Sequence, residues 1–150
     1  EFLLSPNPGQ PLLPLVKIIS GGEMSRFMLA LKVISSRYAG VGTMIFDEID
    51  TGISGAIGLE VAKKLAEISR HSQVLCVTHL PQIASMADRQ YFIEKSSDGT
   101  TTRTGVRLLD RAGMIDEISR LSGARGVSSA AKRSAEELKD WSDGYKAGLV

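Results

Sequence analysis

Apolar residues recur on one side of an α-helix in two stretches of the chain. Their spacing predicts two amphipathic helices. The apolar positions are Met24, Phe27, Met28 and Leu31 in the first stretch, and Ile57, Val61, Leu65 and Ile68 in the second. Ser20 stands where an N-cap residue belongs, and Glu23 favours a first turn. The first helix is therefore predicted to begin there and to end near Arg37.

Two short runs of consecutive apolar residues predict strands that are buried on both faces. The first run is 43–46, which is followed by Asp47-Glu48. The second is 74–77, which is followed by Thr78-His79. Because a helix separates the two runs, the order strand, helix, strand predicts a parallel sheet with a right-handed crossover. The expected fold class is therefore α/β, with helices flanking a mostly parallel sheet.

The second half of the chain predicts a short helix, a hairpin and two more helices. Pro81 suits the first position of the short helix. The other predicted elements are strands at 91–95 and 103–109 around a turn at 96–99, and helices at about 115–121 and 128–144. No linker interrupts this series, so the chain is predicted to form one domain.

Composition excludes several classes of protein. The chain has 150 residues and a net charge of +1, so its overall charge does not favour binding to nucleic acid or to a membrane surface. Its one cysteine, Cys76, lies in an apolar run and predicts a small buried side chain. No apolar run is long enough to span a bilayer, so a cytoplasmic location is expected. The strand-like opening at 1–4 has no start signal, and we expect the chain to be part of a longer protein.

Two adjacent acids, Asp47 and Glu48, follow the first predicted strand. In open α/β sheets, ligands bind at the carboxyl ends of the strands. One carboxylate there can hold a hydrated Mg²⁺ ion, and the next can orient an attacking water. Taken alone, the pair could equally be two solvated acids that open a loop.

Residues 20–23 and His79 have two interpretations each. A helix start with two glycines can bind a phosphate through its free N–H groups, but it can also be an ordinary N-cap. His79 would lie at the same sheet edge as Asp47 and could sense a terminal phosphate, but a lone histidine is more often bonded to the backbone.

Read together and in order, these motifs resemble the second half of an ABC ATPase. In that family SGGE at 20–23 is the signature motif, 44–48 is the Walker B motif, Asp50 is the acid of the D-loop and His79 is the switch histidine. The continuation 24–32 and the stretches 46–55 and 73–84 are similar to the SMC-related branch, and in particular to its bacterial members that act in DNA double-strand break repair and recombination.

The resemblance implies a fold and a set of roles. Residues 1–150 would be the C-terminal lobe of an ABC/SMC-type P-loop ATPase head. The implied roles are catalysis by Glu48 and His79, Mg²⁺ binding by Asp47, and contact with ATP by Ser20, Gly21, Gly22, Glu23 and Asp50.

The chain contains no G-x-x-x-x-G-K-[ST] loop and no heptad run long enough for a coiled-coil arm. The family places these elements in an N-terminal lobe and an arm between the two lobes. The resemblance therefore implies three partners: that lobe, a second head joined through ATP, and DNA. It also implies a nucleoid-associated location and an inactive isolated fragment.

Three alternatives remain from the sequence. The first is the nucleotide-binding domain of a transporter or of another SMC-like protein, and the second is an interaction domain that has lost its chemistry. The third is DNA binding by basic residues of the tail, although interleaved acids favour a solvated face. Those residues are Arg103, Arg107, Arg111, Arg120, Arg125, Lys132 and Arg133.

Overall fold

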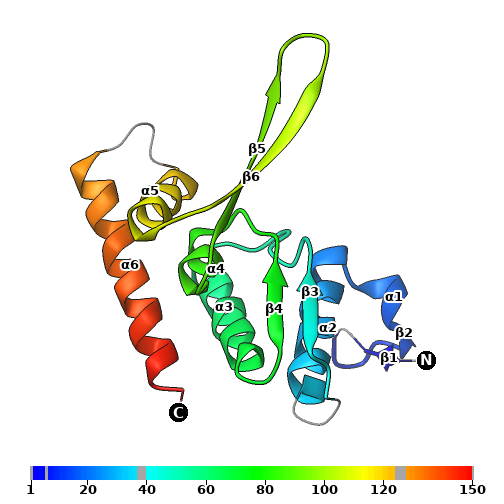
Figure 1. The fold of residues 1–150 in the computed structure, drawn as a ribbon. Helices are drawn as coiled ribbons and strands as arrows, with labels where there is room; N and C mark the ends of the chain where they lie inside the picture. Colours follow the sequence, from blue (N-terminus) through cyan, green and yellow to red (C-terminus); the bar gives the residue numbers. More distant parts are fainter. Residues whose placement is uncertain (1, 6, 37–39, 124–127, 150) are drawn as a thin grey trace. The chain divides into compact units, whose positions relative to one another are not determined.

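The computed structural model describes residues 2–5, 7–36, 40–123 and 128–149. The chain divides into two compact units, Glu1–Thr78 and His79–Val150, and each is described by itself. Figure 1 shows their elements in chain order. The first unit contains β1 (Leu3–Leu4), β2 (Leu13–Pro14), α1 (Leu15–Ile18), α2 (Gly21–Ser36), β3 (Thr43–Phe46), α3 (Gly55–Ser69) and β4 (Gln73–Cys76).

A parallel strand pair forms the centre of the first unit. β3 and β4 lie in register, with Met44 opposite Val74 and Phe46 opposite Cys76. The helix α3 connects them and contacts both β4 and α2 (Figure 1). This confirms the predicted parallel strand, helix, strand arrangement, and it brings the carboxyl ends of both strands to one edge.

Only one face of this strand pair is buried. Met44 and Phe46 point into the core, and α2 packs on the side of Phe46. On the other face Ile45 is 65% exposed and Leu75 is 46% exposed. The prediction of burial on both faces is therefore wrong for this chain, because its helices cover one side of the pair only.

The second unit is built from helices and a hairpin. Its elements are α4 (Pro81–Met86), β5 (Tyr91–Ser97), β6 (Thr102–Leu108), α5 (Arg111–Leu121) and α6 (Ser129–Ala147). Side-chain oxygens cap both long helices: Asp110 accepts a hydrogen bond from the N–H of Gly113, and Ser128 accepts one from the N–H of Ala131. These elements match the predicted ones to within a few residues.

The core of the second unit lies where α4, α5 and α6 meet. Ala84, Ile115, Ile118 and Ala135 are buried together, and Leu138 packs against them. On α6, Ser142 is also fully buried, whereas Trp141 is 42% exposed. The hairpin β5–β6 is antiparallel, and among its large apolar residues Tyr91, Ile93, Val106 and Leu108 are exposed.

In the described part of the chain, no helix has both the length and the apolar character needed to cross a bilayer.

The packing of the second unit predicts that two isoleucines differ greatly in how much stability is lost when each is replaced by alanine. Ile118 has no exposed surface, whereas Ile93 on the hairpin is 57% exposed. Replacing Ile118 with alanine leaves a cavity and should lower the free energy of unfolding by about 2–5 kcal/mol. The matched change Ile93→Ala should cost less than about 1 kcal/mol. Denaturant titration of both variants tests this, and similar losses would contradict the position of the core.

Candidate functional site

A reciprocal pair of hydrogen bonds fixes the start of α2. The backbone N–H and the hydroxyl of Ser20 donate to the Glu23 carboxylate at 2.7 and 2.8 Å, and the N–H of Glu23 donates to the Ser20 hydroxyl at 3.3 Å. This is a capping box, as the residue types at the two positions predict. These bonds lower the pKa of Glu23: the Ser20 backbone bond contributes most, followed by the Ser20 hydroxyl. Both side chains thus serve the helix start itself.

The two glycines of the signature-like motif are left with free backbone groups. Within the described residues, no acceptor is bonded to the N–H of Gly21 or of Gly22. Gly21 is exposed and has no heavy atom near the place where a Cβ would lie. The helix start therefore presents two unused donors and the positive end of the α2 dipole, an arrangement that favours an anion.

Gly22 lies against the turn that follows β3. A Cβ atom on Gly22 would overlap with the carbonyl oxygen of Thr51, which is backbone and cannot rotate away. Only glycine allows this approach. The contact places the start of α2 beside the segment that carries Asp47, Glu48 and Asp50.

The two acids after β3 are both exposed. Glu48 has a φ of +54°, and it is the single non-glycine residue in the described ranges with a positive φ. The left-handed conformation costs an L-residue about 1–2 kcal/mol. Backbone strain of this kind concentrates at functional sites, where the surrounding structure enforces it. The turn is closed by the N–H of Thr51, which donates to the carbonyl oxygen of Glu48 at 3.2 Å.

Asp50 occupies a different environment from its neighbours. It is 3% exposed, and its carboxylate accepts a hydrogen bond of 2.6 Å from the Thr78 hydroxyl. The bond joins the turn after β3 to the segment after β4. In this structure the carboxylate of Asp50, which the resemblance assigns to ATP contact, is buried and bonded to Thr78.

Cys76 on β4 is partly buried, in keeping with the small apolar role predicted for it. Burial, with smaller contributions from the charges of Asp50 and Asp47, raises its pKa to about 12. The thiol therefore stays protonated and is a poor nucleophile.

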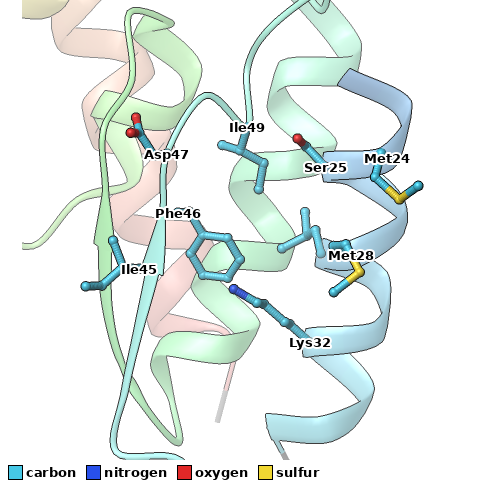
Figure 2. A pocket seen from close by; sticks show the side chains of 9 residues that line it. Met24, Ser25, Met28, Lys32, Ile45, Phe46, Asp47 and Ile49 are labelled. Carbon is cyan, nitrogen blue, oxygen red and sulfur yellow. The ribbon is translucent and has the colours of Figure 1, made fainter. Parts of the chain in front are cut away.

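A cavity of about 170 Å³ lies between α2 and β3. Figure 2 shows Met24 and Met28 on one side of it, with Phe46 and Ile49 facing them. The Lys32 ammonium lies 4.6 Å from the centre of the Phe46 ring, within cation–π range. The lining combines apolar side chains with Ser25, Lys32 and Asp47, so the carboxylate of Asp47 lies at the edge of this space.

His79, the predicted phosphate sensor, is the first residue of the second unit and is exposed. It follows the end of β4 by three residues and leads directly into α4. Its assigned role remains a prediction.

A divalent ion would have few protein ligands here. The described residues contain no group of three or more histidine, cysteine, aspartate or glutamate side chains that could hold a metal. Mg²⁺ does not need such a group, because it keeps several waters and binds through one or two carboxylates together with substrate phosphates. The exposed carboxylate of Asp47 has the chemistry for one such bond.

Two residues of this region did not stand out in the sequence. Arg26 has a buried guanidinium nitrogen, Nη1, with no hydrogen-bond partner in the described part, and it lies beside Gly22. Thr78 holds Asp50. Arg26 lies one helical turn after Glu23, and this spacing was a signal for it. Nothing in the sequence indicated the role of Thr78.

Acids neutralise several of the basic residues proposed for DNA binding. Arg111 pairs with Asp140 and Asp143, and Arg120 pairs with Glu117. Lys132 pairs with Asp116. These pairs agree with the solvated-face interpretation of the tail. Arg125 lies outside the described residues.

Comparison with known proteins identifies relatives along nearly the whole chain. It is 47% identical to the DNA repair protein RecN of Halalkalibacterium halodurans over 146 residues, covering 97% of the chain and 26% of that protein. It is 46% identical to the RecN protein of Bacillus subtilis over 147 residues, covering 97% of the chain and 25% of that protein. The chain thus spans about a quarter of the length of these relatives. No protein-family model matches it.

A solved structure supports the fold. It comes from work on the structural biochemistry of "ATP-driven dimerization and DNA stimulated activation of SMC ATPases". The TM-score is 0.54 at 21% sequence identity, and the alignment covers 83% of this chain and 81% of that one. The chain therefore has the fold of part of an SMC ATPase head, as its motifs predicted.

Replacing either glycine of the motif at 20–23 with alanine should change stability, but in opposite directions. Gly22→Ala forces the new methyl group against the Thr51 carbonyl and should lower the free energy of unfolding by about 1–3 kcal/mol. Gly21→Ala meets no atom, and the higher helix propensity of alanine should leave stability unchanged or raise it by up to about 1 kcal/mol. Equal effects in chemical unfolding would show that Gly22 does not touch this turn.

The capping box predicts a pH dependence. Because the folded protein lowers the pKa of Glu23 below 4.5, its stabilising effect is complete above that pH and is lost as the pH falls through the lower, folded value. The stability difference between the wild type and Glu23→Gln should therefore shrink as the pH falls from neutral to values below 4.5. Ser20→Ala removes the hydroxyl and should reduce that change. Unfolding measured at several pH values tests this, and a difference that does not depend on pH would contradict it.

Proposed function

We infer that this chain, which belongs to the RecN family, forms the C-terminal lobe of an SMC-like ATPase head that acts in DNA double-strand break repair and recombination. The observation that carries this proposal is the contact of Gly22 with Thr51. It brings an exposed anion-binding helix start and an exposed pair of acids into one compact unit. That combination has a clear use in phosphoryl transfer and little use in an inert interaction domain.

The acids would divide the work at the nucleotide. Asp47 would bind Mg²⁺, which neutralises charge on the transferring phosphate when it is present. Glu48 would accept a proton from the attacking water and hold that water in line. The positive φ of Glu48 turns its backbone out of the strand direction, so the two adjacent carboxylates need not compete for one position.

The helix start of α2 would serve the ATP of a second head. The free N–H groups of Gly21 and Gly22 suit the terminal phosphate, and the capping box keeps them in place by engaging Ser20 and Glu23. ATP would then be shared between two heads as the link of a homodimer. Its hydrolysis removes an anion from this helix start and releases the heads, which would drive a DNA clamp.

His79 and Asp50 would have different parts. His79 would contact the terminal phosphate of ATP as a hydrogen-bond donor. Asp50 is buried and bonded to Thr78, so we assign it the task of holding the turn that carries Glu48.

The exposed apolar face of the strand pair is the observation that supports a further interaction partner. Parallel sheets are normally covered on both faces, and Ile45, Leu75 and Val77 are uncovered here. We assign this face to the N-terminal lobe of the same protein, which would supply the phosphate-binding loop. The whole protein would work in the cytoplasm, at the nucleoid.

The role of Glu48 can be tested in the full-length protein. Glu48→Gln keeps the size of the side chain and removes the base, so ATP turnover should fall by about 10²–10⁴-fold while ATP binding persists. The variant should therefore accumulate as a closed dimer with ATP, measured by light scattering. Glu60→Gln, a change to an exposed acid on α3, is the matched control and should retain turnover. A Glu48→Gln protein that stays monomeric with ATP would count against Glu48 as the base.

A further inference from the structure

The segment that begins with His79 is anchored by a helix too short to be stable alone. α4 has six residues, and isolated helices of this length do not persist in water. Its last four residues, 83–86, are buried. Leu80, next to His79, is also buried, and its carbonyl oxygen accepts the N–H of Ala84 at 3.0 Å. The backbone at His79 is therefore placed by whatever holds α4.

A buried contact between two serines joins α4 to α6. The hydroxyls of Ser85 and Ser142 lie 2.9 Å apart, and neither residue has exposed surface. Each hydroxyl also lies 2.9 Å from a carbonyl oxygen of its own helix, that of Gln82 for Ser85 and that of Leu138 for Ser142. Two protons are available for these three contacts, so at most two of them are hydrogen bonds at once, and the helices are bridged when one hydroxyl donates to the other and not to its own carbonyl. Without its partner, the remaining hydroxyl loses a buried hydrogen bond.

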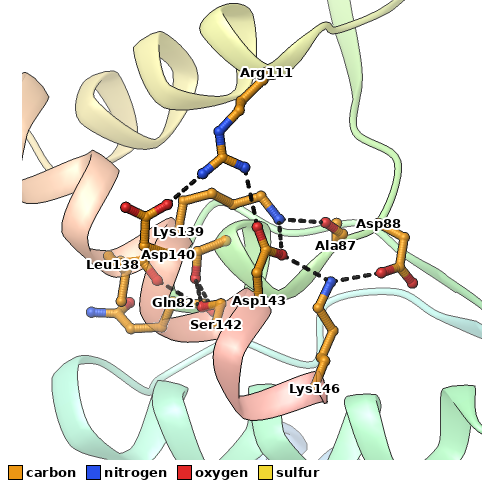
Figure 3. Close-up of polar contacts among 11 residues, drawn as sticks. Gln82, Ala87, Asp88, Arg111, Leu138, Lys139, Asp140, Ser142, Asp143 and Lys146 are labelled. Atoms are coloured by element: carbon orange, nitrogen blue, oxygen red, sulfur yellow. Dashed lines mark hydrogen bonds and ion pairs between the residues drawn. The ribbon is translucent and has the colours of Figure 1, made fainter.

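A second buried group ties the residues after α4 to the same helix. Lys139 is 4% exposed, and its Nζ donates to the carbonyl oxygen of Ala87 at 3.1 Å and to the Asp143 carboxylate at 2.7 Å. Lys146 donates to Asp88 at 2.6 Å. Figure 3 shows these side chains of α6 reaching the segment that follows α4. Both ends of α4 are thus bounded by fixed backbone.

The Asp143 carboxylate connects this cluster to α5. It lies 3.2 Å from the Arg111 guanidinium and 3.3 Å from Lys146 Nζ, in addition to Lys139. Burial acts to raise its pKa, but the hydrogen bonds from Lys139, Arg111 and Lys146 outweigh burial and hold the pKa below its usual value. The cluster therefore favours the charged carboxylate.

We propose that α6 positions the His79 segment through this buried polar cluster, with Ser142 and Lys139 as positioning residues. Apolar contacts alone would let a short helix slide or rotate on α6 at little cost, whereas a buried polar contact is satisfied in one register only. The proposal rests on the proposed role of His79. Its consequence is that residues more than fifty positions from His79 in the sequence control how its ring meets a phosphate.

The test is a double-mutant cycle on ATP turnover by the full-length protein. Ser142→Ala should lower kcat by about tenfold or more, because small displacements of a catalytic group are costly, and should change KM for ATP by less than about twofold. In a His79→Ala background the same substitution should have no further effect, since the group that it positions is gone. Ser134→Ala, at an exposed serine of the same helix, is the control and should leave both constants unchanged. Lys139→Met, which removes the charge and keeps the length, should repeat the result of Ser142→Ala.

Hydrogen exchange of the same full-length variants gives a readout without turnover. Ser142→Ala should speed exchange of the amides at 80–88, and Ser134→Ala should not. Equal kcat losses for Ser142→Ala with and without His79, or unchanged exchange at 80–88, would overturn the positioning role while the proposed ATPase function stands. If His79→Ala itself leaves turnover unchanged, the proposed role of His79 fails and the positioning role fails with it.

Discussion

The approach of Gly22 to the Thr51 carbonyl is the constraint on which the first unit depends. It sets the distance between the start of α2 and the turn after β3, and no residue with a Cβ fits there. The same turn holds Glu48 in a left-handed conformation, and its residue Asp50 accepts a hydrogen bond from Thr78, which follows β4. One backbone contact therefore orients the helix dipole, the exposed acids and the ends of both strands relative to one another. The strain at Glu48 persists because the residues on either side of it are fixed.

In the second unit, buried polar groups fix how the helices pack. Its apolar core is small, and two buried hydroxyls lie between α4 and α6, while a buried lysine of α6 bonds the residue that follows α4. Buried polar groups contribute little net stability, but leaving one unpaired is costly, so alternative packings are disfavoured. A short helix held in this way can carry a functional residue at its start without having a stable conformation of its own.

Local patterns in the sequence predicted the elements well. The residue types at Ser20 and Glu23 predicted the capping box, and Pro81 predicted the start of α4. It was harder to predict which faces of the strands are buried. A run such as Thr43–Phe46 is typical of two-sided burial, yet in this chain only one side is covered, since burial depends on what packs against the strand. The left-handed backbone at Glu48 and the burial of Asp50 and Lys139 depend on tertiary contacts, and glutamate, aspartate and lysine are ordinarily exposed residues. The approach of Gly22 to the turn after β3 likewise depends on tertiary packing, and no local pattern indicates it.

The uncovered face of β3 and β4 has a consequence for how such a protein is made. Ile45 on β3 lies opposite Leu75 on β4, and the exposed Val77 follows the end of β4. Among the described residues, no strand pairs with the outer edge of either strand. An exposed apolar surface beside open strand edges is a template for aggregation. During synthesis this surface would be open to chaperones and to other nascent chains.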